Sequence, residues 1–298
     1  MLKRDYVLIT PARDEEAFIE KTIQSVAAQT VLPRKWVIVN DNSRDATERI
    51  ILDYRMQYRF IDLLNLSKNG VQRNFASQVH AIRAGHEQLK KVNYSWIGNL
   101  DADISLPPDY YERIIDKFIR NPKLGLAGGF VHEKTNGSFH SRRYNHPQSI
   151  PHAVQFFRRE CFDSINGYMP LKYGGPDWCA EVMARMKGWQ TESFPEITVF
   201  HHRHTGSVEG ILNAKFRLGL MDYSLGSDPV FEIIKCMYRL REKPYILSSI
   251  FRLAGFCWLY IRREQRMVPD DFVSYLRKEQ KERVANLLKI KNRNNGHV

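Results

Sequence analysis

The chain has 298 residues, of which 43% are hydrophobic and 12% aromatic, and its formal net charge is +12. This composition excludes a disordered or low-complexity protein and is sufficient for one large domain, or for a domain with a helical appendage. The four scattered cysteines form no close pair, which argues against a disulfide framework and a zinc site and makes a reducing cytosol the expected compartment.

The first 131 residues alternate short apolar runs with longer segments of helical periodicity. Strands are predicted at residues 6–10, 36–40, 60–65, 96–100 and 124–131. Helices are predicted at residues 14–29, 45–58, 72–90 and from Pro107 onward. This order indicates an α/β fold with a mostly parallel central sheet and helices on both faces. In such sheets ligands bind beyond the carboxyl ends of the strands, where this sequence places polar residues 10–15, 41–45 and 101–103.

The pattern changes after residue 131. Residues 132–148 are polar and irregular and predict a loop, followed by a helix at 177–187 and a short strand at 196–201. From about residue 207 the sequence is helical to its end. We therefore expect one domain over residues 1–206 and a helical extension over 207–298. The extension is basic, since residues 203–298 hold 18 Lys and Arg against 10 Asp and Glu.

Asp101 and Asp103 follow the predicted strand at 96–100, with only Ala102 between them. Two carboxylates so spaced at a strand end can face one divalent cation, and Mg²⁺ and Mn²⁺ prefer oxygen ligands. The alternative is a pair of solvated aspartates in a turn.

The aspartate pair is the last of three polar motifs that follow one another along the chain. Residues 8–16, 39–45 and 101–103 read LITPARDEE, VNDNSRD and DAD, each at the end of a predicted strand. Their order and spacing resemble those of the inverting glycosyltransferases of family 2. The resemblance covers about residues 6–206 and implies the GT-A, or nucleotide-diphospho-sugar transferase, fold.

The resemblance also implies roles for individual residues. It assigns nucleotide binding to Pro11, Arg13, Glu15, Asp41, Arg73 and Asp101. Within this set Asp41 is expected at the base and Glu15 and Asp101 at the ribose, while Asp103 is expected to hold Mn²⁺ or Mg²⁺. Arg73 and Asn74 resemble a family element, but they are followed by Phe75, where the family has a small residue, so a plain helix N-terminus is an equal alternative there.

Asp177 stands where the family carries its catalytic acidic residue, before a helix that ends in Gly188 and Trp189. The resemblance makes it the general base that deprotonates the acceptor hydroxyl. The alternative is that Asp177 only caps the helix.

Three histidines, at positions 201, 202 and 204, follow the last predicted strand, and a histidine in this region resembles the third metal ligand of some GT-A enzymes. Neighbouring strand residues point to opposite sides, so only one of His201 and His202 is expected to bind metal. We assign His202 and keep His201 as the alternative.

Residues 245–261 form an apolar run of about 25 Å as a helix, too short for a comfortable bilayer crossing. Arg252 in its middle also argues against a transmembrane helix. Flanking basic and aromatic residues suit peripheral contact of residues 239–266 with a membrane surface, and burial in the core or in a dimer is an equal alternative. No secretion signal is expected, so the predicted location is cytoplasmic, at or near the inner face of the cytoplasmic membrane.

The sequence thus predicts a hexosyltransferase-type enzyme that transfers a sugar from a nucleotide-diphosphate sugar, with UDP favoured. The expected acceptor is a glycan or a lipid-linked molecule, in polysaccharide or glycolipid synthesis, and no nucleic acid is expected as a partner. The alternatives are a sugar-phosphate nucleotidyltransferase, a basic nucleic-acid-binding protein and an inactive donor-binding module. The first normally has a glycine-rich basic loop after its first strand, whereas residues 10–15 are acidic and lack glycine.

Overall fold

The computed structural model describes residues 4–67, 75–135, 137–142, 145–203, 210–240 and 245–295. The chain forms two compact units. The first comprises Met1–Pro170 and Pro176–Thr205, and the second comprises Leu171–Gly175 and Gly206–Val298. Residues 171–175 thus belong to the second unit although the chain on either side of them belongs to the first.

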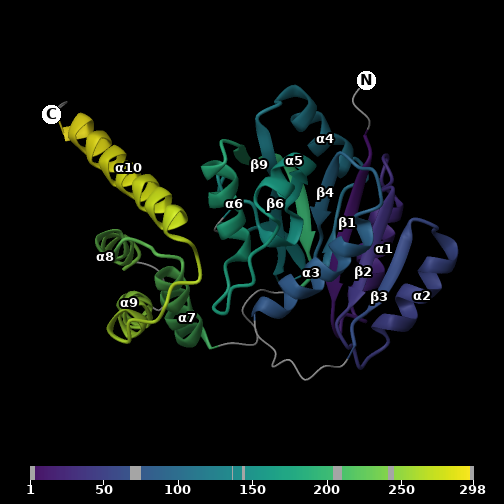
Figure 1. The fold of residues 1–298 in the computed structure, drawn as a ribbon, viewed down its shortest axis with the longest axis horizontal. Helices are drawn as coiled ribbons and strands as arrows, with labels where there is room; N and C mark the ends of the chain where they lie inside the picture. The colour runs from purple at the N-terminus through teal and green to yellow at the C-terminus, as the bar shows by residue number, and fades with distance from the viewer. Residues whose placement is uncertain are drawn as a thin grey trace. The chain divides into compact units, whose positions relative to one another are not determined.

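A single sheet runs through the first unit (Figure 1). Its strands are β1 Tyr6–Ala12, β2 Lys35–Asn40, β3 Ile61–Asn65, β4 Trp96–Asn99, β5 Ile104–Ser105, β6 Leu124–Thr135, β7 Ser138–Ser141, β8 Phe156–Arg158 and β9 Gln190–His201. They lie in the order β3-β2-β1-β4-β8-β6-β9-β5, with β7 paired to β6. The first four strands in this order are mutually parallel, as are β6 and β9, whereas β8, β5 and β7 pair antiparallel with their neighbours.

Helices cover both faces of the sheet because side chains alternate along buried strands. Tyr6 and Leu8 belong to a cluster with α1 Ile19–Ala27, α2 Thr47–Gln57 and α4 Tyr110–Arg120. Val7 and Ile9 belong to a second cluster with α3 Phe75–Leu89, α5 Arg159–Ser164 and α6 Pro176–Met186. Runs of consecutive apolar residues in β1 and β2 are therefore required, since neither face meets water.

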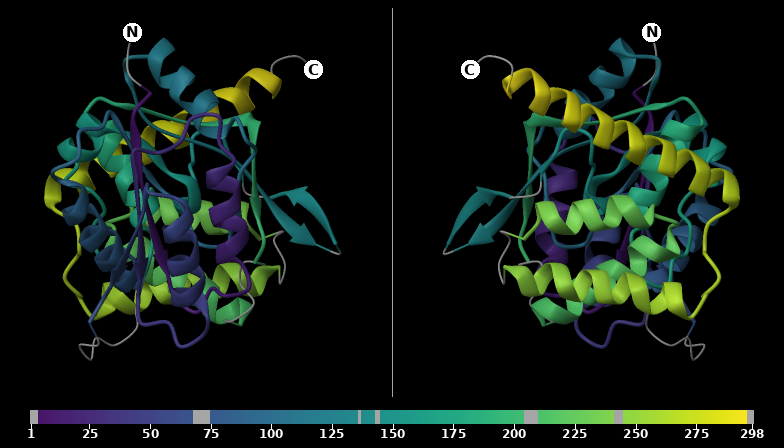
Figure 2. Two further views of the ribbon diagram at one scale, coloured as in Figure 1. Left: turned by 90° about the vertical axis from the view of Figure 1, so that its right-hand side faces the viewer. Right: turned by 90° about the vertical axis from the view of Figure 1, so that its left-hand side faces the viewer.

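The structure confirms the predicted α/β fold, and it differs from the sequence predictions in detail. The first helix begins at Ile19 rather than residue 14, because Asp14 has a left-handed backbone with φ of 54° and residues 16–18 form a turn. The predicted loop at 132–148 is wrong, since β6 continues to Thr135 and pairs with β7 as a hairpin that projects from the first unit (Figure 2). The short strands β5 and β8 were not predicted.

The second unit contains α7 Ile211–Ser224, α8 Pro229–Tyr238, α9 Ile246–Ile261 and α10 Asp270–Asn295. Two glycines let α7 and α9 approach closely. A Cβ atom at Gly219 would lie 1.9 Å from the Arg252 carbonyl oxygen, and one at Gly255 would lie 2.1 Å from that of Phe216. Any side chain at either position would force the two helices apart.

Candidate active site

The loops after β1 and β2 are joined by hydrogen bonds between their side chains and backbones. The Asp14 N–H donates to Ser43 Oγ at 3.1 Å, and the Arg44 N–H donates to Asp14 Oδ1 at 2.8 Å. The Glu15 N–H donates to Thr47 Oγ1 at 2.7 Å. The polar residues of both motifs therefore support each other, which holds Glu15 at the carboxyl edge of the sheet.

Three predicted nucleotide-binding residues lie together at this edge. Pro11 pairs with Val39 across the parallel strands, and the Asp41 N–H donates to the Ala12 carbonyl at 2.9 Å. The Arg13 guanidinium lies 3.5 Å from Asp41 Oδ2, with both side chains partly exposed. The structure thus brings together Pro11, Arg13 and Asp41.

Asp101 follows β4 on the neighbouring strand. Its Oδ1 accepts a hydrogen bond from Gln78 at 3.1 Å and lies 3.6 Å from His152 Nδ1. Burial acts to raise the pKa of Asp101, but its hydrogen bond and charge interaction with His152 outweigh that effect and hold the pKa below its usual value. Asp101 is therefore an anion at neutral pH.

Asp103 is 8% exposed and lies among basic and acidic groups from three segments. Its Oδ2 lies 3.2 Å from His201 Nε2 and 3.3 Å from Arg203 Nε, and Arg203 also pairs with Glu15. Burial and the charge of Asp103 raise the pKa of Glu15 to about 7, against the opposing effect of Arg203. Glu15 and Asp103 are thus near neighbours, and both carboxylates pair with the guanidinium of Arg203.

The pairing of β5 with β9 determines which histidine faces Asp103. Ile104 pairs with His201, and the ring of His201 lies between Asp103 and Glu133, whose Oε1 is 3.8 Å from Nδ1. His202 points the other way, and its Nε2 lies 2.8 Å from Ser105 Oγ. The structure therefore brings His201, rather than the assigned His202, to Asp103.

Asp177 lies in the first turn of α6, one residue after the start of the helix at Pro176. Its charge and that of Asp101 both raise the pKa of His152, so this ring lies within electrostatic reach of both carboxylates. Burial acts in the opposite direction on His152, and its Nε2 is buried without a hydrogen-bond partner among the described residues. The charge of Asp177 thus acts on the same histidine that contacts Asp101.

A divalent cation fits the donor set only if the substrate supplies further ligands. In the residues that the structure describes, no group of three or more His, Cys, Asp or Glu side chains is arranged to hold a metal. Asp103 and His201 provide one carboxylate oxygen and one imidazole nitrogen near each other. Mg²⁺ and Mn²⁺ are commonly held by one or two protein ligands together with phosphate oxygens and water, so this pair fits a metal that is bound with a diphosphate.

Two candidate residues, Arg73 and His204, lie outside the described residues. His152, Glu133 and Arg203 were not predicted as site residues. His152 and Glu133 reach the site through the turn that precedes β8 and through the pairing of β6 with β9, and no local motif marks them. Arg203 stands within the run of histidines at 201–204, which was the signal that could have pointed to it.

The parallel strands β1, β2 and β4 carry acidic residues at their carboxyl ends, within a mixed sheet of the GT-A type. Residues 7–175, more than half of the chain, match the model of glycosyl transferase family 2, and the chain belongs to that family. This match confirms the predicted family, the predicted GT-A fold and the predicted glycosyltransferase class. Membership also favours a glycosyltransferase over the nucleotidyltransferase and nucleic-acid-binding alternatives.

Curated relatives match part of the chain. The chain is 30% identical over 118 residues to a poly-β-1,6-N-acetyl-D-glucosamine synthase of Staphylococcus epidermidis, a match that covers 39% of this chain and 26% of the synthase. A similar enzyme of Staphylococcus aureus is 28% identical over 116 residues. The chain therefore spans about a quarter of the length of the curated relatives that it matches.

Solved structures show the same fold at low sequence identity. Residues 1–349 of S. aureus TarS in complex with UDP-GlcNAc align with a TM-score of 0.58 and 12% identity, over 95% of this chain and 92% of that one. The mannosyltransferase PcManGT of Pyrobaculum calidifontis, in complex with GDP-Man and Mn²⁺, aligns with a TM-score of 0.55 and 13% identity, over 95% of this chain and 86% of that one. In the part of the chain that the structure describes, no helix has the length and apolar character that a bilayer crossing needs.

Proposed function

We propose that the chain transfers a sugar from a UDP-sugar to a hydroxyl of a glycan or lipid-linked acceptor, with inversion at the anomeric carbon. The observation that carries this proposal is the convergence of Glu15, Asp41, Asp101 and Asp103 at one sheet edge in a family 2 chain. UDP-N-acetylglucosamine is the first donor to test, because a curated relative is a poly-β-1,6-N-acetyl-D-glucosamine synthase and a structural neighbour was solved in complex with UDP-GlcNAc. Polysaccharide or glycolipid synthesis is the corresponding process.

In this proposal the nucleotide lies along the ends of β1, β2 and β4. Asp41 accepts a hydrogen bond from a ring N–H of the base, beside Pro11 and Arg13. The carboxylates of Glu15 and Asp101 accept hydrogen bonds from the ribose hydroxyls. Arg73 is proposed as a further nucleotide contact on the strength of its motif alone.

Asp103 and His201 are the residues proposed to hold Mn²⁺ or Mg²⁺. The ring of His201 lies between Asp103 and Glu133, at 3.2 and 3.8 Å, and a carboxylate beside the second ring nitrogen commonly orients a metal-binding histidine. When bound, the ion would neutralise the charge of the departing diphosphate. The position of His202 beside Ser105 favours His201 over the assignment made from the sequence.

Asp177 is the proposed general base. The acceptor oxygen attacks the anomeric carbon, its proton passes to the Asp177 carboxylate, and the bond from the anomeric carbon to the diphosphate oxygen breaks. The nucleoside diphosphate leaves with the bonding electrons. Asp177 lies in the first turn of α6, one residue after the helix begins at Pro176.

The catalytic role is proposed for the domain over residues 1–206, and the extension over 207–298 is proposed to be non-catalytic. A location at the inner face of the cytoplasmic membrane, with peripheral contact through residues 239–266, would suit a lipid-linked acceptor.

Release of nucleoside diphosphate from UDP-N-acetylglucosamine, UDP-glucose and GDP-mannose, with Mn²⁺ or EDTA, tests the proposed function. The proposal expects metal-dependent release of UDP from one UDP-sugar by the full chain, and loss of that release in Asp103→Ala. Equal release from all donors by wild type and variant, at the uncatalysed rate, would refute it.

A pair of histidine variants tests the proposed metal site. His201→Ala is expected to weaken UDP binding in the presence of Mn²⁺ by at least about tenfold, whereas His202→Ala should leave it nearly unchanged. Calorimetric titration of UDP into each variant, with Mn²⁺ and with EDTA, measures both effects. If His202→Ala loses affinity and His201→Ala does not, His202 is the metal ligand after all.

A further inference from the structure

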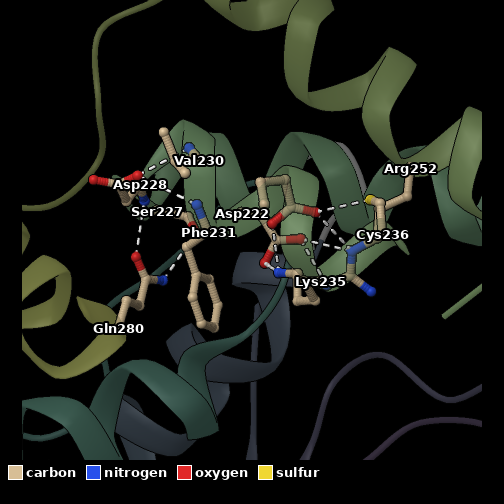
Figure 3. A network of polar contacts seen from close by, with 10 residues as sticks. Asp222, Ser227, Asp228, Val230, Phe231, Lys235, Cys236, Arg252 and Gln280 are labelled. Carbon is tan, nitrogen blue, oxygen red and sulfur yellow. Dashed lines mark hydrogen bonds and ion pairs between the residues drawn. The ribbon is translucent and has the colours of Figure 1, made fainter. Parts of the chain in front are cut away.

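Helices α8 and α9 bury their charged side chains. Arg252 lies at the centre of α9, is 7% exposed, and its guanidinium contacts Asp222 Oδ2 at 2.6 Å and Glu232 Oε1 at 3.1 Å. Lys235 contacts Asp222 Oδ1 at 3.0 Å and also pairs with Glu232 (Figure 3). Two cations and two anions thus neutralise one another inside the second unit.

The outer faces of the same two helices are apolar. On α8, Val230, Ile233 and Met237 recur at helical spacing and are 48–65% exposed, and Tyr238 beside them is 84% exposed. On α9 the corresponding side chains are those of Ile246, Leu247, Ile250, Trp258 and Ile261, which are 50–77% exposed. These residues form what we call the α8–α9 apolar face.

This arrangement inverts the usual order of a water-exposed helix, which turns its charges outward and its apolar side chains inward. The buried side of α9 holds Arg252 together with Phe256 and Leu259, whereas its exposed stripe consists of isoleucine, leucine and tryptophan. Exposed apolar side chains gathered along helices in this way mark an interaction site. A low-dielectric partner on the outer side would remove these exposed apolar side chains from water, which is favourable.

The chemistry around the apolar face favours a lipid surface. Residues 229–267 hold eight Lys and Arg against three Asp and Glu, and Arg262 and Arg263 follow directly after the exposed Ile261. Exposed Tyr238, Tyr245, Trp258 and Tyr260 have the amphipathic rings that concentrate at the boundary between headgroups and acyl chains. Basic residues next to an inserted apolar face add attraction to anionic lipids.

We propose that the α8–α9 apolar face inserts into the interfacial region of an anionic membrane and attaches the protein there without crossing the bilayer. Asp222 and Glu232 neutralise the charge of Arg252, so the arginine at the centre of α9 does not oppose insertion of the helix. The proposal extends the expected contact to α8 and does not depend on the glycosyl-transfer activity.

A second copy of the chain is a less suitable partner for the α8–α9 apolar face than a lipid surface. A two-fold contact would place the same surface against itself. Basic residues flank α9 in the sequence on both sides, so either relative orientation of two such helices would bring like charges together. Repulsion of this kind opposes self-association and is relieved by a negatively charged lipid surface.

Sedimentation with lipid vesicles tests the proposal on the full chain. We expect the protein to sediment with vesicles of equal parts phosphatidylcholine and phosphatidylglycerol, and to bind phosphatidylcholine vesicles more weakly. The double substitution Met237→Ser and Ile250→Ser should lower the partition coefficient about hundredfold, since loss of each large apolar contact costs about tenfold. The matched control is Met56→Ser on α2, because Met56 is 86% exposed in the other unit and its loss should leave the partition unchanged.

A second measurement does not depend on any variant's folding. Brominated phospholipids should quench the fluorescence of wild-type protein on anionic vesicles, and Trp258→Phe should remove most of that quenching. The proposal is overturned if wild-type protein stays in the supernatant with both kinds of vesicle, or if quenching is the same with and without Trp258. It is also overturned if light scattering shows a stable dimer that the double substitution dissociates, since a second copy would then cover the face.

Discussion

Asp177→Asn is expected to lower kcat for sugar transfer by about 10²–10⁴-fold and to leave the affinity for the donor nucleotide unchanged. The range is that of a lost general base, because the amide has the shape of the carboxylate but cannot accept the proton. Asp177 lies in the first turn of α6, and its carbonyl oxygen, which the substitution retains, accepts a hydrogen bond from Gln155 at 3.2 Å. The site should therefore keep its structure, and only the proton transfer should fail.

The measurement is steady-state kinetics with the donor identified by nucleotide release, together with calorimetric titration of UDP. Asp163→Asn is a suitable control, since its side chain is 53% exposed on α5 and lies 3.6 Å from Arg159 Nε, one helical turn away. Its kcat should equal that of wild type. An unchanged kcat in Asp177→Asn would exclude Asp177 as the base and leave it a helix-terminal residue.

Arg252→Ala is expected to lower the free energy of unfolding of the second unit by about 3–5 kcal/mol, the effect of removing one partner from a buried ion pair. The substitution leaves Asp222 and Glu232 buried with only Lys235 to neutralise them. Burial and the charge of Asp222 already raise the pKa of Glu232, so the loss of Arg252 adds to an existing cost.

Hydrogen exchange followed by mass spectrometry resolves this effect because it reports on α7 to α9 separately from the sheet. Protection of amides in α9 should fall by at least about hundredfold in Arg252→Ala. Arg262→Ala provides the comparison, since Arg262 is exposed at the end of the same helix and packs over the Trp258 ring at 5.0 Å. Its effect should stay within about 1 kcal/mol. Equal protection in wild type and Arg252→Ala would show that the ion cluster adds nothing to stability.

The sequence was informative where a strand and its polar end are adjacent in the chain. The apolar runs of β1, β2 and β4 each lead directly into a polar motif, and parallel strands bring their carboxyl ends to one edge. This rule was sufficient to place Glu15, Asp41 and Asp101 at a common site. It depends only on local pattern and on the direction of the strands.

The choice of histidine could not be predicted in the same way. It depends on the two-residue strand β5, whose pairing with β9 turns His201 toward Asp103. A strand that short has no periodic signal. The position of His152 likewise depends on the turn before β8, which brings it to Asp101 from residues far along the chain.

The sequence also left open which side of α9 is buried. Its many apolar residues suit a core helix, a dimer contact or a membrane surface equally well. The packing of Arg252 against Asp222 and Glu232 shows that this charge lies on the inner side. Hydrophobic periodicity identifies a helix and its apolar stripe, but the direction of that stripe depends on what the opposite side contacts.

The central claim, that the sheet edge binds a nucleoside diphosphate together with a metal ion, is tested most directly by thermal denaturation of the wild-type chain with UDP, GDP, dTDP or CMP, each with Mn²⁺ or EDTA. A ligand at about a hundred times its dissociation constant adds about 2.7 kcal/mol to stability, which shifts the transition by several degrees. The account predicts that UDP with Mn²⁺ raises the midpoint and that EDTA removes most of the shift. If no nucleotide moves the midpoint with either addition, the acidic cluster at Glu15, Asp41, Asp101 and Asp103 is not a donor site.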